Sequence, residues 1–356
     1  MRQARGMSLT TIGTLADGRE IREALLVTRA GAEARIMELG ATLRDLLVPA
    51  RGGGKQRVVL GFDGLAVYEQ GAHHAGAIAG RYANRIAHGR FSLDGRSFQL
   101  GLNEAGRHSL HGGAHGFGRR PWKLVEHGSN AATLALVSPA GDEGYPGTLR
   151  VWCRYELMEP ATLALDLAAT TDAATIVNLA QHSYFNLDGS DDARDHELRI
   201  AADFYTPTDS ELIPTGEIAR LAGTPFDFRV ARPVRHVPAG ASMPFGYDVN
   251  FVLDRSRGES SGGLALAHAA TLTSRGNGMS LEVWTTEPGL QLYDCHNMEF
   301  SARGHDGRRY GRGAGLALEA QRFPDSPNRA HFQSAVLRPG ETYRQRTEYR
   351  FIAPRG

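Results

Sequence analysis

Residues 151–168 read Val-Trp-Cys-Arg-Tyr-Glu-Leu-Met-Glu-Pro-Ala-Thr-Leu-Ala-Leu-Asp-Leu-Ala and contain two runs of alternating character. Apolar side chains hold every second position of each run: Val151, Cys153, Tyr155 and Leu157, then Leu163, Leu165 and Leu167. Because successive side chains of an extended chain point to opposite faces, this period of two predicts strands with unlike faces. Residues 281–284 repeat the pattern, which indicates a fold made of β-strands.

Turn signals surround these runs. Residues 91–93 and 98–100 flank Asp94-Gly95, a pair that tolerates the positive φ values of a type I′ turn and so predicts a hairpin. The chain has 43 glycines, so turns are plentiful. Helical periodicity is nearly absent, and only residues 65–70 predict one or two helical turns. Many short strands with frequent turns are typical of an all-β sandwich or barrel.

The length of 356 residues allows one large domain or two of ordinary size. Apolar residues make up 41% of the chain, enough for a sizeable core. There is no repeat of fixed period and no shift to linker-like composition. We therefore expect a single domain over residues 1–356, with residues 1–9 as a loose N-terminal extension and Met7 as an alternative start to Met1.

The charge balance bears on partners and location. Lys and Arg number 40 against 39 Asp and Glu, whereas polyanion-binding proteins usually carry a clear basic excess. We therefore expect no nucleic-acid partner, and a solvated loop at the Gly- and Arg-rich residues 301–315. No apolar run suits a membrane span or a signal peptide, so we expect no membrane partner and a cytoplasmic location. Cys153 and Cys295 are expected to be reduced core thiols, and the near-zero net charge permits a monomer or a weak homodimer.

Polar residues gather with glycines and aromatic residues in a few short segments. These segments are residues 80–86, 109–117, 178–186, 223–229, 246–253 and 318–325, with a weaker one at 288–293. A sugar needs directional hydrogen bonds to its hydroxyls and aromatic faces against its C–H groups, and these segments supply both. The composition fits a sugar as the small-molecule partner, and the fit on composition alone is weak.

Two other kinds of chemistry have weaker support. His111 and His115 have i, i+4 spacing, but Gly112 and Gly113 between them make a helix unfavourable, and no cluster has the spacing of metal ligands. We expect no metal and no cofactor. No Gly-x-Ser-x-Gly segment has the strand–turn–helix setting of a nucleophile elbow. A glutamate in an apolar run, Glu319, is costly unless it is paired or functional, and it suits proton transfer.

The same segments resemble the aldose 1-epimerase (galactose mutarotase) family. The family patterns match, in family order, at residues 80–89 (Gly-Arg-x-Ala-Asn-Arg-Ile-Ala-x-Gly), 110–117 (Leu-His-Gly-Gly-x-x-Gly-Phe), 178–187 (Asn-Leu-x-x-His-Ser-Tyr-Phe-Asn-Leu), 224–229 (Thr-Pro-Phe-Asp-Phe-Arg), 246–253 (Gly-Tyr-Asp-x-Asn-Phe-Val-Leu), 318–325 (Leu-Glu-x-Gln-x-Phe-Pro-Asp) and 337–343 (Leu-x-Pro-Gly-Glu-x-Tyr). The resemblance covers about residues 10–352 and is highly specific as a set.

The resemblance implies a large antiparallel β-sandwich, or supersandwich, with a sugar cleft on one face. It implies an isomerase that interconverts the α and β anomers of free aldoses such as glucose or galactose. Glu319 matches the general base for the C1 hydroxyl, and His182 matches the general acid for the ring oxygen. The substrate-binding positions of the family match Asn84, Arg85, His111, Tyr184, Asp248 and Gln291. No cofactor or metal is required.

Other functions stay open on the sequence. One is a non-catalytic sugar-binding protein on the same fold. Another is a hexose-phosphate epimerase of a related group, for which Arg85, Arg119 and Arg120 would supply a cationic pocket. A third is a glycoside hydrolase using Glu319 and Asp248 as paired carboxylates. The chain departs from the family pattern at His108, Val249, Ala320 and residues 294–297, and the departures at His108, Val249 and residues 294–297 bear on which aldose is preferred.

Several further expectations concern the surroundings of the site. Burial is expected to raise the pKa of Glu319, and a neighbouring carboxylate to raise that of His182, which predicts a bell-shaped or sloping pH profile. Structural or more distant roles are expected for Arg81, for His73, His74, His108 and His115, and for the core tryptophans Trp122, Trp152 and Trp284.

Overall fold

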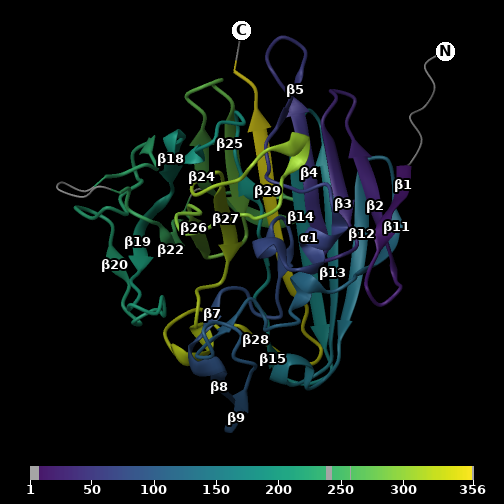
Figure 1. Ribbon diagram of the computed structural model, residues 1–356. Coiled ribbons are helices and arrows are strands. Elements are labelled where there is room, and N and C mark those ends of the chain that lie inside the picture. Colours follow the sequence, from purple (N-terminus) through teal and green to yellow (C-terminus); the bar gives the residue numbers. More distant parts are fainter. Residues whose placement is uncertain (1–7, 238–242, 257, 355–356) are drawn as a thin grey trace.

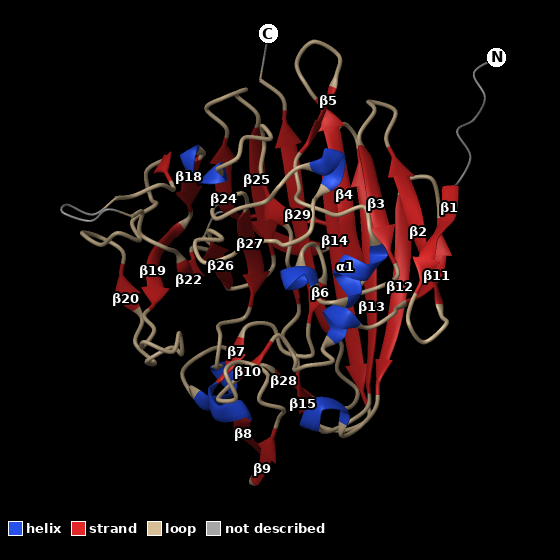
Figure 2. Cartoon of the chain, in the orientation of Figure 1, coloured by secondary structure: helices blue, strands red, loops and turns tan. Residues whose placement is uncertain are grey.

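The computed structural model describes residues 8–237, 243–256 and 258–354 and is built from antiparallel strands (Figure 1). Helices in this part of the chain are limited to short segments around the sheets (Figure 2). These are α1 (Leu65–Glu69) and the 3-10 turns η1 (Ala72–His74), η2 (Ala87–Gly89), η3 (Phe117–Arg119), η4 (Asp142–Gly144), η5 (Ala193–Asp195), η6 (His305–Gly307) and η7 (Ser326–Asn328). The helical turn expected at residues 65–70 is confirmed as α1.

A ten-stranded sheet is the largest element of the fold. It consists, in spatial order, of β11 (Lys123–His127), β12 (Ala131–Ser138), β13 (Leu149–Met158), β14 (Thr162–Thr171), β29 (Tyr343–Ile352), β25 (Ser280–Thr285), β24 (Leu264–Thr273), β18 (Glu197–Ile200) and β21 (Arg232–Pro233), with β23 (Gly258–Ser261) paired to β24. The two runs of alternating residues within 151–168 lie in β13 and β14, which pair along their full length. The C-terminal strand β29 lies in the middle, between β14 and β25.

Two smaller sheets accompany it. The five-stranded sheet contains β1 (Ser8–Thr14), β2 (Glu20–Val27), β3 (Glu33–Met37), β4 (Thr42–Pro49) and β5 (Lys55–Arg57). Ser8 and Leu9 pair with β2, so the strand starts inside the stretch expected to be loose; residues 1–7, including Met7, lie outside the described residues. The six-stranded sheet contains β17 (Tyr184–Phe185), β27 (Leu316–Gln321), β26 (Gly289–Tyr293), β22 (Asp248–Leu253), β19 (Ala202–Thr206) and β20 (Ala219–Arg220).

Four two-stranded ladders in the described part of the chain are separate from these sheets. They are β6 (Ile78–Ala79) with β16 (Ala180–Gln181), β7 (Arg85–Ile86) with β10 (Ser109–Leu110), β15 (Thr175–Ile176) with β28 (Val336–Leu337), and β8 (Arg90–Leu93) with β9 (Arg96–Gln99). The last pair confirms the hairpin expected around Asp94-Gly95, where both residues have positive φ. The ladder β7–β10 joins two of the polar segments, and β16 lies within a third.

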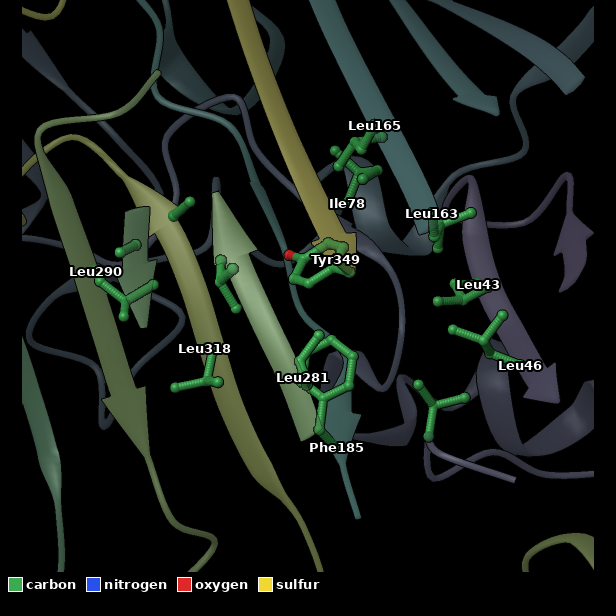
Figure 3. Packing of buried hydrophobic residues seen from close by; sticks show 14 of the residues in the cluster. Leu43, Leu46, Ile78, Leu163, Leu165, Phe185, Leu281, Leu290, Leu318 and Tyr349 are labelled. Carbon is green, nitrogen blue, oxygen red and sulfur yellow. The ribbon is translucent and has the colours of Figure 1, made fainter. Parts of the chain in front are cut away.

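One apolar core lies between the sheets (Figure 3). Leu290 and Leu318 come from the six-stranded sheet, and Leu43 from the five-stranded sheet. They belong to the same buried cluster as Leu281 and Tyr349 of the ten-stranded sheet. The expected large antiparallel β-sandwich is confirmed. Among the described residues, no helix has the length and apolar character needed to cross a membrane.

The expectation for the tryptophans is wrong for two of three. Trp122 is buried, but Trp152 is 38% exposed and Trp284 is partly exposed beneath the Arg350 guanidinium. The reason is the period of two: Trp152 and Trp284 occupy the alternate positions whose side chains point away from the core. Cys153 and Cys295 are buried free thiols, as expected.

The expectation of a solvated loop at residues 301–315 is only partly correct. Tyr310 and His305 are buried, and the Tyr310 hydroxyl donates to the Gly61 carbonyl at 3.2 Å. The His305 backbone N–H also donates to the Gly61 carbonyl, at 3.0 Å. These contacts bind the Gly- and Arg-rich segment to the fold on one side.

Candidate active site

A cavity of about 340 Å³ brings the polar segments together. Its lining residues are His73, His74, Asn84, Arg85, Leu110, His111, His182, Tyr184, Leu212, Asp248, Tyr293, Asn297, Met298 and Glu319. All the site residues expected from the sequence line it except Gln291, which lies behind Asp248 and donates from Nε2 to Asp248 Oδ1 at 2.5 Å. A larger cavity of about 630 Å³, near Trp284 and His268, contains none of them. The chemistry is therefore concentrated in the smaller cavity.

Strand register explains how the six-stranded sheet supplies the acidic side of the cavity. Glu319 of β27 lies opposite Gln291 of β26, and Asp248 of β22 lies opposite Tyr293 of β26. Their sequence neighbours, such as Leu318, belong to the apolar core. Because side chains alternate along a strand, the polar set must point to the other face of the sheet, where the cavity lies.

Glu319 and His182 form a close buried pair. His182 Nε2 lies 3.7 Å from Glu319 Oε1, and both side chains are almost fully buried. Glu319 Oε2 and His182 Nδ1 have no hydrogen-bond partner among the described residues. Two buried polar atoms without partners are costly, which is typical of groups that await a ligand.

Burial shifts the pKa values of this pair in opposite directions. Burial, together with the negative charge of Asp248, raises the pKa of Glu319 to about 8 against the opposing effect of Arg85. Burial lowers the pKa of His182 to about 4. The expectation of a raised His182 pKa is wrong, because desolvation of the imidazolium is the largest effect on this group and disfavours its charged form.

His111 is held in one tautomer by the backbone. Its Nδ1 accepts the Asn84 backbone N–H at 3.2 Å, and the His111 backbone N–H donates to the Asn84 carbonyl at 3.1 Å. Both residues have left-handed φ values, 62° for Asn84 and 51° for His111. Burial keeps the pKa of His111 well below its usual range, so the ring is neutral. With Nδ1 accepting, the proton of the ring must be on Nε2, which makes His111 a hydrogen-bond donor.

The same geometry tests whether a metal fits. His111, His182 and Glu319 each offer a ligand atom, and these atoms lie within 4.8 Å of one another. Sequence spacing missed this set because its members come from three distant segments. A metal-bound histidine normally donates from its second ring nitrogen, but Nδ1 of His111 accepts a hydrogen bond instead. The set therefore suits hydrogen bonding to a sugar better than ligation, and the absence of a metal stays a prediction.

Arg85 is held by two carboxylates. Its Nε and Nη2 donate to Glu104 at 2.7–3.0 Å, and its Nη1 donates to Asp248 Oδ2 at 3.4 Å. Burial raises the pKa of Asp248, although Arg85 and Gln291 oppose the shift. Sequence reasoning missed Glu104, since it lies between two motifs and carries no pattern of its own.

Two of the histidines expected at a distance reach the cavity. His73 and His74 belong to η1 and have left-handed φ values of 48° and 61°. The Tyr184 hydroxyl fixes this turn by donating to the His73 carbonyl at 2.9 Å. By contrast, His108 is buried outside the cavity with Nε2 3.2 Å from Glu211 Oε2, and His115 is exposed. The expectation was wrong for His73 and His74 because a tight turn reverses the chain there.

The other arginines do not line the cavity. Arg81 is buried and donates to the carbonyls of Ser138, Pro146 and Gly147, which confirms its structural role. Arg120 pairs with Asp142. The cationic pocket that a sugar phosphate would need is therefore not assembled from Arg85, Arg119 and Arg120.

The departures from the family pattern lie mostly outside the cavity. Val249 and Ala320 point into the apolar core. Asp294 is buried and pairs with His296 Nδ1 at 2.8 Å. Asn297 alone among residues 294–297 lines the cavity, where its side-chain oxygen accepts the Tyr293 hydroxyl.

Known proteins resemble the chain over nearly its whole length. The sequence model of the aldose 1-epimerase family matches residues 23–350. Galactose mutarotase of Bos taurus is 41% identical over 323 residues, 89% of this chain and 90% of that one. Aldose 1-epimerase of Escherichia coli K12 is 37% identical over 344 residues, covering 95% and 97%. The crystal structure of an aldose epimerase homologue from C. elegans superposes with a TM-score of 0.85 at 30% identity, covering 94% and 100%.

Proposed function

The chain belongs to the aldose 1-epimerase family, and from that premise we propose that it interconverts the α and β anomers of free aldoses such as galactose and glucose, with Glu319 and His182 as the acid–base pair. The observation that supports this most directly is the buried pair itself. Two titratable groups 3.7 Å apart, each with an unpartnered atom, line a cavity rich in hydrogen-bonding groups.

The reaction requires a proton to leave one oxygen and another to reach its neighbour. The step starts with the single proton of the pair on His182 and with Glu319 ionised. Glu319 then takes the proton of the C1 hydroxyl while the bond from C1 to the ring oxygen breaks and His182 protonates that oxygen. The open-chain aldehyde rotates about C1–C2, and the ring oxygen attacks the other face of C1. The two protons then return, so the enzyme ends as it began. Both reacting oxygens are bonded to C1, which explains why the acid and the base lie so close together.

The remaining polar residues have roles in binding. We propose that Arg85, Asn84 and His111 donate hydrogen bonds to sugar oxygens and that Asp248 accepts from hydroxyls. Gln291 orients Asp248 through its 2.5 Å hydrogen bond. Tyr184 offers an aromatic surface to the C–H groups of the sugar, next to the apolar residues Leu110, Leu212 and Met298.

The alternatives fit this geometry less well. A sugar-binding protein needs no buried pair of unpartnered titratable groups. A hexose-phosphate epimerase needs a free cation, but Arg85 is engaged by two carboxylates. A glycoside hydrolase needs a second free carboxyl, and Asp248 is bound by Arg85 and Gln291.

The test is polarimetry of freshly dissolved α-D-galactose and α-D-glucose. Wild-type protein should accelerate mutarotation over buffer, and Glu319→Gln should lose about 10²- to 10⁴-fold of kcat. Glu287→Gln is the matched control. Glu287 is also a buried glutamate whose pKa burial raises to about 7, but it lies outside the cavity, so activity should be unchanged. Folded wild-type protein without activity on any free aldose would contradict the proposal.

The remaining expectations are also proposals. Dialysis against EDTA should leave activity unchanged if no metal is required, and a loss that Zn²⁺ restores would contradict this. Light scattering should report a monomer or a weak homodimer. A cytoplasmic location stays a prediction.

A further inference from the structure

Charge in the cavity is set by very few groups. Among the lining residues, Arg85 is the one arginine or lysine, and Asp248 and Glu319 are the carboxyl groups. The four lining histidines do not add positive charge, because burial lowers the pKa of each of them. A substrate anion would therefore depend on Arg85.

The Arg85 guanidinium already forms an ion pair with the Glu104 carboxylate. The carboxylate binds Nε and Nη2 side by side at 2.7–3.0 Å, the two-point geometry in which guanidinium–carboxylate pairs are strongest. The Glu104 side chain is only about a quarter exposed, and Arg85 is more deeply buried, so solvent screens the pair weakly. Glu104 itself is fixed in a tight turn, in which its carbonyl accepts the backbone N–H groups of Arg107 and His108.

We propose that Glu104 is a positioning residue that sets substrate specificity: by binding Arg85 it compensates the one fixed cation of the cavity and makes the site select neutral aldoses over aldose phosphates. This inference rests on the proposed function. Arg85 then faces two carboxylates, Glu104 and Asp248, so the fixed charges around it carry a net negative charge. A phosphate dianion would be repelled, whereas a neutral sugar still finds the remaining guanidinium N–H groups.

The experiment compares α-D-glucose with α-D-glucose 6-phosphate. Wild-type protein should have a far lower kcat/KM for the phosphate. Glu104→Gln keeps the shape but removes the charge, so the ratio of kcat/KM for phosphate to that for glucose should rise at least about tenfold. The rise should appear mainly in KM and should shrink in 0.5 M NaCl, because salt screens charge. Glu104→Asp keeps the charge and should restore a ratio near that of wild type.

The matched control is Asp94→Asn. Asp94 also binds an arginine at two points, Arg338 at 2.8 and 2.9 Å, but at the tip of the hairpin β8–β9. Loss of the Asp94 charge should leave the ratio of kcat/KM for glucose 6-phosphate to that for glucose unchanged. An unchanged ratio in active Glu104→Gln, or an equal loss on both substrates, would overturn the proposal and assign Glu104 a structural role. Wild-type protein inactive on glucose would instead overturn the proposed function.

A measurement on wild-type protein keeps the proposal testable if the variants fail to fold. Glucose 6-phosphate and sulfate should inhibit glucose mutarotation only weakly, with inhibition constants well above the KM for glucose. Competitive inhibition by either anion at or below that KM would show an open cationic site and overturn the proposal.

Discussion

Burial acts differently on each kind of side chain in the cavity. It penalises the charged form, so it raises the pKa of a carboxyl group and lowers that of an imidazole. For Glu319 and His182 the two shifts move the pKa values past each other, to about 8 and about 4. Between these values the pair holds one proton in total. Since the groups are 3.7 Å apart, that proton belongs to the pair rather than to one residue.

The pH dependence of kcat/KM should report this single proton. Below about pH 4 both groups are protonated and no base is available. Above about pH 8 both have lost their protons and no acid is available. We expect a broad maximum between these limits, measured by polarimetry with buffer catalysis subtracted at each pH. A flat rate from pH 5 to 9 would refute the assignment of the pair.

Glu319→Gln serves as the control for the alkaline limb. Its residual activity should lose the limb near pH 8, because glutamine does not titrate. A limb that persists unchanged in this variant would assign it to another group.

At the scale of single residues, the sequence predicted the site residues that lie inside recognisable motifs. It did not predict the residues that reach the cavity from turns outside those motifs. Glu319, His182 and Asp248 were predicted from their segments and line the cavity. Glu104 and Leu212 were not, because each reaches the site from a turn with no pattern of its own. The direction of the His182 pKa shift was also missed, since it depends on the depth of burial.

Among the structural elements, the turn after β10 shows how tightly the site is built. Gly112 has φ +88°, and a Cβ at this position would lie 1.9 Å from the Gly80 carbonyl oxygen. It follows His111 directly, so any displacement of the turn moves a binding residue. Close backbone contact, rather than conformational freedom alone, therefore requires glycine here.

Substitution of Gly112 by alanine should be costly in both stability and activity. We expect Gly112→Ala to lower the free energy of unfolding by at least about 2 kcal/mol, measured by urea denaturation, and to raise KM in polarimetry. Gly340→Ala is the matched control, with φ +85° but no atom within 4 Å of the added Cβ. It should cost about 1 kcal/mol and leave KM unchanged. Equal effects of the two substitutions would show that the left-handed backbone conformation alone, and not the close contact with Gly80, determines the cost of replacing Gly112.

At the scale of elements, the alternation of apolar and polar residues predicted the long strands but did not predict the short ones. It predicted β13, β14 and β25, and the Asp-Gly turn predicted the hairpin β8–β9. The two-residue ladders such as β7–β10 are too short to show a period, and their partners are distant in sequence. These ladders bring the polar segments together. The sequence therefore predicted which residues form the site but not how they are arranged in space.

The whole molecule depends on contacts between its sheets. Phe185 of the six-stranded sheet is 1% exposed, and its ring centroid lies 5.1 Å from that of Tyr349 in the ten-stranded sheet (Figure 3). Its backbone also bridges to Val59, which follows the five-stranded sheet. One residue thus contacts parts of the chain that are far apart in sequence, through its ring and through its backbone. If the chain is a single domain, as the lack of a linker-like segment predicts, these sheets must unfold together.

Phe185→Ala tests that prediction. Loss of a large buried ring should lower the free energy of unfolding by about 3–5 kcal/mol. Scanning calorimetry should show one transition in wild type and variant, with calorimetric and van't Hoff enthalpies equal and the variant shifted to lower temperature. Val230→Ala is the control, because Val230 is 79% exposed and its loss should change stability by less than about 0.5 kcal/mol. Two transitions, with only one displaced by Phe185→Ala, would show that the sheets belong to separate domains and that the apolar core between them is not cooperative.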